Sequence, residues 1–163
     1  MLIHLKNKDT LLIDDFELKC CIGKNGVTKK KKEGDKCTPF GTYKLGKLYY
    51  RSDRVNKPKT KLQTKEIKKN MGWCNNPKSE FYNKEILIDD NNGYESLYRK
   101  DNKYNYIIII NYNRKKIIPY KGSAIFLHLT NNYKATAGCI AVKKSDFEII
   151  IKLINKKTKI KDN

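Results

Sequence analysis

Two residues in the last third of the chain carry the functional groups of a cysteine nucleophile and its base. Cys139 follows Gly138 and precedes the short apolar run 140–142, and His128 lies eleven positions earlier, at the end of the apolar segment 124–127. A thiol becomes a strong nucleophile when a neighbouring imidazole removes its proton. Two adjacent strands joined by a loop would bring these side chains together. The spacing by itself is more typical of two packing residues.

The residues beside Cys139 suit an attack on a carbonyl group. Gly138 has no Cβ, so the backbone can approach a substrate closely there. The backbone N–H groups of Gly138 and Cys139 would then face the oxyanion that develops on the attacked carbonyl. The sequence therefore predicts nucleophilic acyl chemistry if His128 and Cys139 meet.

The other cysteines and histidine do not suggest a metal site. Cys20, Cys21, Cys37, Cys74 and His4 are scattered, and no C-x-x-C pair occurs. Five cysteines is an odd number, so at least one thiol is free unless it pairs between chains. A zinc site would need ligands from distant parts of the chain. We therefore expect no metal and no cofactor, and we expect the adjacent pair 20–21 to lie in a strand or core.

The elements that must position His128 and Cys139 are mostly strands. Short apolar segments separated by polar turns predict a hairpin, a third strand and three later strands. They are residues 2–5 and 11–13, then 16–22, 42–50, 104–111 and 123–129. We expect a mainly β fold, a twisted β-sandwich or open barrel, with the His and Cys strands meeting at one end.

A C-terminal helix is predicted beside these strands. Ser145 and Glu148 form a Ser-x-x-Glu capping box. Ile149, Ile150, Leu153 and Ile154 give the helix an apolar face at helical spacing. The basic tail from Lys156 onward is expected to fray.

The middle of the chain is polar and predicts few regular elements. Residues 51–92 contain Pro58 and Pro77, and a short helix over residues 64–70 is weakly indicated. The expected anchors are Trp73, Phe81 and Tyr82. We interpret residues 51–92 as a loop-rich insertion that shapes a site, within one catalytic domain over residues 1–163.

The charge is strongly positive. Thirty-six Lys and Arg against 17 Asp and Glu give a net charge of +19, spread along the chain. Such a charge attracts anionic polymers, although an A/T-rich genome also produces Lys-rich sequences. The longest apolar run, residues 107–110, is too short to span a bilayer, and no signal peptide is visible. We expect no transmembrane segment and no specific nucleic-acid partner.

Four blocks of the sequence resemble the YkuD-type L,D-transpeptidase catalytic domain. Residues 122–128 (GSAIFLH) and 136–141 (TAGCIA) are similar to the family's His strand and its [Ser/Thr]-x-Gly-Cys block. Residues 33–43 are similar to an E-G-D-x-x-T-P-x-G segment, and residues 72–83 to a W-x-x-D-P…Y-N stretch of one bacterial branch. The blocks occur in the family's order and cover most of the chain.

The resemblance implies a role for each matching residue. Cys139 would be the acyl-accepting nucleophile and His128 its base. The backbone carbonyl of Leu129 would orient the imidazole, and Gly138 with the Cys139 backbone would form part of the oxyanion hole. Thr136, at the family's Ser/Thr position, would brace the loop, and Ser123 of the GSAIF block would support the site.

The resemblance also implies a substrate and a mechanism. A stem peptide of peptidoglycan would acylate Cys139 and release a terminal D-amino acid, and an amine acceptor would resolve the thioester without a cofactor. We expect a monomer that acts in the cell envelope. Ala137 and Ala141 depart from the residues that many members carry, which bears on substrate contacts.

Other functions remain open from the sequence. Resolution of the thioester by water would make the protein an L,D-carboxypeptidase, and the same dyad would serve another Cys-His amide hydrolase. A catalytically silent, basic protein that binds wall polymer or nucleic acid is an alternative from a different class.

Overall fold

The first three strands form an antiparallel meander, as predicted. The computed structural model describes residues 1–88 and 93–162, and it begins with β1 (Leu2–Leu5), β2 (Thr10–Ile13) and β3 (Phe16–Cys21). β1 pairs with β2, and β2 pairs with β3. Cys20 and Cys21 are buried at the end of β3, as expected for core residues.

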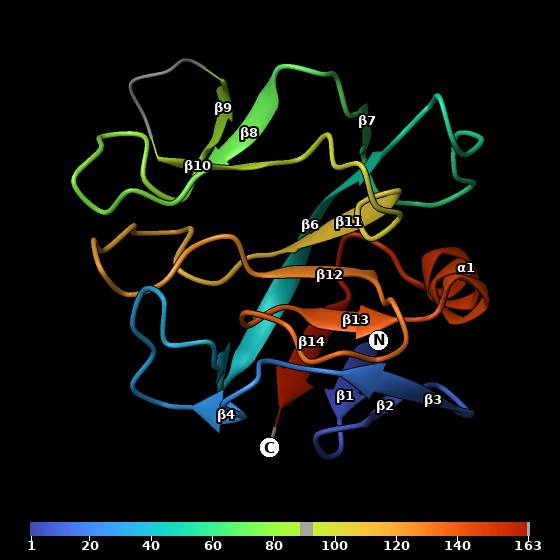
Figure 1. Cartoon of the computed structure of the whole chain (residues 1–163). Coiled ribbons are helices and arrows are strands. Elements are labelled where there is room, and N and C mark those ends of the chain that lie inside the picture. The colour runs from blue at the N-terminus through green and yellow to red at the C-terminus, as the bar shows by residue number, and fades with distance from the viewer. Residues whose placement is uncertain (89–92, 163) are drawn as a thin grey trace.

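These strands belong to a β-barrel (Figure 1). The remaining strands of the large sheet are β6 (Thr42–Tyr50), β7 (Thr64–Glu66), β11 (Tyr106–Ile110), β12 (Phe126–Leu129), β13 (Ile140–Val142) and β14 (Lys159–Asp162). The strand order is β11-β12-β13-β3-β2-β1-β14-β6-β7, and β11 also pairs with β6. The second pairing closes the ring, so the predicted mainly β barrel is confirmed and is closed.

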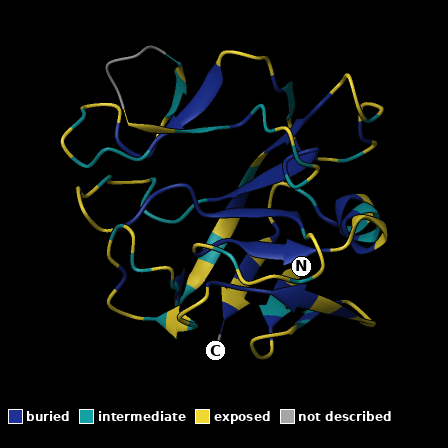
Figure 2. Cartoon of the chain, viewed as in Figure 1, coloured by how far each residue is buried: buried dark blue, intermediate teal, exposed yellow. Residues whose placement is uncertain are grey.

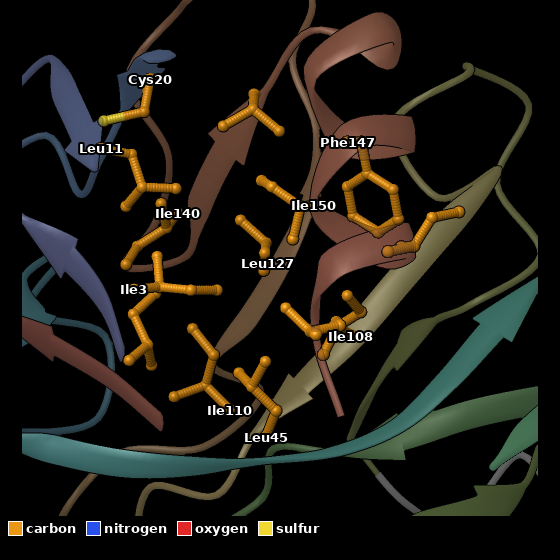
Figure 3. Close-up of a cluster of buried hydrophobic side chains, with 14 of the residues drawn as sticks. Ile3, Leu11, Cys20, Leu45, Ile108, Ile110, Leu127, Ile140, Phe147 and Ile150 are labelled. Carbon is orange, nitrogen blue, oxygen red and sulfur yellow. The ribbon is translucent and has the colours of Figure 1, made fainter. Parts of the chain in front are cut away.

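Aliphatic side chains fill the interior. Ile3, Leu48, Ile108 and Leu127 are fully buried, and Figure 3 shows three of them within one cluster. Figure 2 shows that burial is concentrated in the barrel strands, whereas many loop residues are exposed. Burial of this kind contributes roughly 1.5–3 kcal/mol for each large apolar side chain, so the barrel is a rigid support for the residues on its outer wall.

The single helix of the described chain, α1 (Lys144–Leu153), packs on this core. Phe147 stacks on Tyr106 with ring centroids 5.4 Å apart, and Ile150 is fully buried. The capping-box prediction was wrong, because Lys143 is the N-cap residue and Ser145 lies inside the first turn. The helix begins at Lys144, two positions after β13 ends at Val142.

Residues 159–162 of the C-terminal tail form a strand, and the prediction that the tail frays was wrong. β14 pairs with β1 in parallel and with β6 in antiparallel orientation. Ile160 alternates with exposed lysines and is 3% exposed. This two-residue alternation is the signature of a half-buried strand, and the basic side chains obscured it.

A second, smaller sheet lies over one side of the barrel (Figure 1). It comprises β8 (Met71–Cys74), β9 (Glu85–Leu87) and β10 (Tyr94–Ser96), in the order β10-β8-β9. Trp73 of β8 packs edge-on against Phe126 of β12, with ring centroids 5.1 Å apart. The expected anchoring role of Trp73 is therefore confirmed, as is that of buried Tyr82, whereas Phe81 is exposed.

Residues 51–92, predicted as a loop-rich insertion, contain β7, β8 and β9, and their last four residues lie outside the described residues. The weakly indicated helix over residues 64–70 was wrong. β7 adds to the edge of β6, and Ile67 donates its N–H to the carbonyl of Tyr50. A last short pair joins β4 (Val27–Thr28) to β5 (Thr38–Pro39).

Candidate active site

β12 and β13 place His128 and Cys139 on the face of the barrel wall that packs against the second sheet. The two strands pair in parallel, with His128 opposite Ala141, and Cys139 directly precedes β13. Both side chains line one cavity of about 390 Å³. The His and Cys strands pair as predicted, but their functional side chains lie on the wall of the barrel and not at its end.

The Cys139 thiol is buried and hydrogen-bonded to the backbone of the segment before β12. Its Sγ lies 3.2 Å from the carbonyl oxygen of Ala124, to which it donates, and accepts the N–H of Phe126 at 3.4 Å. Burial raises the pKa of this thiol above its ordinary value, and Glu95 raises it further. Cys139 is therefore a neutral thiol near pH 7.

The imidazole of His128 is held in one orientation. Nδ1 lies 2.8 Å from the carbonyl oxygen of Leu129, and the ring packs edge-on against Tyr104 with centroids 5.2 Å apart. Because a carbonyl oxygen only accepts, Nδ1 carries the proton and Nε2 is left with a free lone pair. Burial lowers the pKa of His128 to about 4, so the ring is neutral near pH 7.

Thr136 lies at the centre of the loop before Cys139. Its hydroxyl donates to the carbonyl of Cys139 at 2.6 Å and accepts the N–H of Gly138 at 3.1 Å. Thr38, from the segment 33–43, donates to the Gly138 carbonyl at 2.9 Å. Two threonines from distant parts of the sequence thus fix the backbone on both sides of Gly138.

Gly138 is required by the protein's own backbone. Its φ of +138° is rarely adopted by other residues, and a Cβ there would lie 2.7 Å from the carbonyl oxygen of Cys37. The close approach predicted for a substrate is instead made by the loop that carries Thr38. The expected oxyanion role of the Gly138 and Cys139 amides stays a prediction.

The segment that leads into β12 is anchored by a hydroxyl–carboxylate cluster. Ser123 donates to Glu33 Oε2 at 2.8 Å, and the hydroxyl of Tyr82 donates to the same oxygen. Tyr82 in turn accepts the N–H of Gly122 at 3.0 Å. Ser123 and Glu33 both line the cavity.

Asn83 holds the same segment from the other side. Its Oδ1 accepts the indole N–H of Trp73 at 3.0 Å and the backbone N–H of Ala124 at 3.1 Å. Ala124 has a φ of +53°, a left-handed conformation that this bond stabilises. The strand predicted over residues 123–129 therefore starts only at Phe126.

Several residues of the cavity were missed by the sequence analysis. Lys31, Lys103, Tyr104, Glu95 and Arg99 all line it beside the dyad. They come from β10 and from loops with no recognisable motif, so only the fold brings them to His128 and Cys139. Arg99 is ion-paired with Asp101 at 2.6 Å, and its guanidinium lies over the Tyr104 ring.

All five cysteines are free thiols. Across residues 1–88 and 93–162, no group of three or more His, Cys, Asp or Glu side chains is arranged to hold a metal ion. Nor does this part of the chain contain a helix with the length and apolarity to span a membrane.

Comparison with known proteins gives one match. A family model described as YkuD, L,D-transpeptidase catalytic domain, matches residues 2–161, which is nearly the whole chain. No curated protein and no solved structure matches.

Proposed function

Since the chain belongs to the YkuD family of L,D-transpeptidase catalytic domains, we propose that it transfers acyl groups between peptidoglycan stem peptides through a thioester on Cys139. The site of action would be the cell envelope, where that substrate lies. No cofactor is needed for this chemistry.

One observation carries the proposal. Cys139 and His128 line the same cavity from paired strands, and the Leu129 carbonyl holds the His128 ring with Nε2 free to accept a proton. A nucleophile, a base and a third group that orients the base form the general arrangement of covalent acyl transfer. In this chain the orienting group is a backbone carbonyl.

The first half of the reaction would form the thioester. The Cys139 S–H, which donates to the Ala124 carbonyl in the empty site, would turn to Nε2 of His128, and its proton passes there as Sγ bonds to the substrate carbonyl carbon. The tetrahedral oxyanion would be met by the amides of Gly138 and Cys139, and the Gly138 amide must first leave Thr136. The C–N bond then breaks, and the amine of the departing D-amino acid takes the proton from His128.

The second half would resolve the thioester. An acceptor amine attacks the carbonyl carbon, His128 accepts the amine proton, and the C–S bond breaks. The Cys139 sulfur then recovers the proton from His128, which returns both groups to their neutral resting state. Water in place of the amine would give L,D-carboxypeptidase activity.

Product analysis tests this proposal. The full chain is incubated with a tetrapeptide stem and a different D-amino acid, and the products are identified by mass spectrometry. We expect exchange of the terminal residue, its loss in Cys139→Ala and its retention in Cys37→Ala, which alters a thiol outside the cavity lining. Release of the terminal residue without exchange would support a hydrolase. No turnover of the stem in the intact protein would support the silent-binder alternative.

A further inference from the structure

A carboxylate from the second sheet faces the proposed nucleophile. Glu95 is the middle residue of β10 and pairs with Trp73 of β8. Residues directly opposite in an antiparallel pair project from the same face of a sheet. Because Trp73 packs against Phe126 of β12, this face is the one turned toward the barrel. Glu95 accordingly lines the cavity that contains Cys139 and His128.

This carboxylate is hydrogen-bonded but is not neutralised by a salt bridge. The Tyr104 hydroxyl donates to its Oε1. Of the eight salt bridges within the described residues, none includes Glu95 or its cavity neighbour Glu33. The absence is notable in a chain with 36 Lys and Arg.

Two cations of the cavity lining are paired with other carboxylates, whereas Lys36, Lys103 and Lys134 line the cavity without a salt bridge among the described residues. Arg99 is 2.6 Å from Asp101, and Lys31 is 2.5 Å from Asp35. Asp35 also accepts the backbone N–H groups of Lys32 and Cys37 at 2.7 and 2.9 Å, which fixes the Lys31 partner in place. Glu95 has no cation within salt-bridge distance among the described residues, so a cationic ligand could approach it without displacing one.

The position of Glu95 opposes activation of Cys139. Burial raises the pKa of Glu95, and Glu95 in turn raises the pKa of the Cys139 thiol. A negative charge beside a thiol disfavours the thiolate. A cationic part of the substrate in contact with the Glu95 carboxylate would cancel this rise in the pKa of the Cys139 thiol.

We propose that Glu95 is a specificity-determining residue that binds the acceptor of the transfer reaction as a primary ammonium ion. The inference rests on the proposed function, since it names the second substrate of the same site. An aliphatic amine has a pKa of about 10.4, so near pH 7 it arrives as the ammonium form that a carboxylate attracts.

The proton balance of the second half-reaction is then complete. The ammonium loses one proton to the Glu95 carboxylate, which passes it to solvent. The resulting neutral amine attacks the thioester carbonyl carbon, and His128 takes the second proton as the C–N bond forms. The C–S bond breaks, and Cys139 recovers that proton from His128. The products are an amide, a neutral thiol and one proton in solvent.

Binding of an acceptor analogue tests the inference without turnover. The probe is Nα-acetyl-lysine amide, which has a free side-chain ammonium and no carboxylate, and its Nε-acetylated form is the uncharged control. Both are titrated into the full-length protein and followed by NMR. We expect the ammonium probe to bind the wild type and to bind Glu95→Gln about 10- to 100-fold more weakly, the usual effect of losing a charged hydrogen bond.

The Glu95→Gln variant keeps an oxygen that can accept from Tyr104, so it preserves the local packing. Glu80→Gln is the matched control, because it removes one negative charge from an exposed position outside the cavity lining. We expect Glu80→Gln to bind both probes as the wild type does. Equal affinity of the wild type and Glu95→Gln for the ammonium probe, or equal affinity of the wild type for the two probes, would overturn the inference.

The ratio of transfer to hydrolysis of the thioester tests the role of Glu95 during turnover. In Glu95→Gln we expect release of the donor's D-amino acid to continue while transfer to the lysine amine falls at least about tenfold relative to hydrolysis. If release and transfer fall together, Glu95 serves the donor or the fold, and the inference fails. If the wild type forms no thioester, the proposed function fails and the NMR titration alone decides the ammonium site.

Discussion

Burial keeps the Cys139 thiol and the His128 imidazole neutral in the resting protein. The pKa of the thiol is raised and that of the imidazole is lowered, in both cases mainly by loss of contact with water. A preformed thiolate–imidazolium pair is therefore disfavoured in the empty site. In the proposed mechanism, proton transfer would therefore accompany the attack on the substrate carbonyl, and the thiol would gain its reactivity only when a donor occupies the cavity.

This protonation state predicts an unusually acidic pH limit for activity. Neutral His128 is the form that accepts the thiol proton, and its pKa is about 4 instead of the ordinary 6.5. As pH falls, kcat/KM for the stem peptide should stay level through pH 6 and decline only toward pH 4. The profile is measured from the initial rate of D-amino acid release.

His128→Gln is the control for that profile, and it should lose activity at every pH. An acid limb centred near 6.5 in the wild type would contradict the buried, neutral imidazole described above.

At the scale of elements, two sheets from distant parts of the sequence meet at the site. β12 and β13 of the barrel supply His128 and the position of Cys139, whereas β10 of the small sheet supplies Glu95. Phe126 of β12 lies where the two sheets meet, packed edge-on against Trp73 of β8 and against Tyr104. The geometry of the cavity depends on this aromatic contact between the sheets.

β14 links β1 to β6 within the barrel and should contribute strongly to stability. Ile160→Ala would leave a cavity in the core and lower the free energy of unfolding by about 2–5 kcal/mol. The neighbouring Lys161 is exposed, so Lys161→Ala should change that free energy by no more than about 0.5 kcal/mol. Urea unfolding followed by tryptophan fluorescence measures both variants. Equal stabilities of the two variants would mean that the buried face of this strand does not stabilise the barrel.

The sequence predicted the elements with a clear local pattern. The strand at residues 42–50 and the hairpin at the N-terminus have apolar residues bounded by turn signals, and the structure confirms them. The segment 64–66 and the tail at 159–162 are rich in lysine, and their strands form because a partner strand offers hydrogen bonds. Pairing with a distant strand leaves no local signal.

The same limit applies to the candidate site. The positions of Cys139 and His128 could be predicted, because short motifs surround both residues. Glu95 and Tyr104 could not, because they reach the cavity through the packing of Trp73 on Phe126. Thr38 lies in a recognised block, but its bond to the Gly138 carbonyl spans 100 positions and is visible only in the fold.

At the scale of the whole molecule, the net charge of +19 favours contact with anionic polymers. This attraction should depend on salt, whereas the chemistry inside the cavity should not. If six or more anionic groups are neutralised on binding, the affinity for an anionic wall polymer should fall on the order of 10³-fold between about 50 and 200 mM salt. Over that range kcat on an isolated stem peptide should change less than about twofold.

Co-sedimentation with the polymer and the D-amino acid assay measure the two quantities. An affinity that does not change with salt would show that the charge plays no part in polymer binding. A kcat that falls in parallel with polymer affinity would place the charge effect inside the catalytic step.

The most direct test of the account is the site of acylation. The intact protein is mixed with a tetrapeptide stem, quenched in acid and examined by mass spectrometry, and the adduct is then mapped by digestion. We predict one added acyl group, bound as a thioester to Cys139 and formed far more slowly in His128→Ala. An adduct on another of the five cysteines, or exchange products formed by Cys139→Ala, would contradict the assignment of Cys139 as the nucleophile.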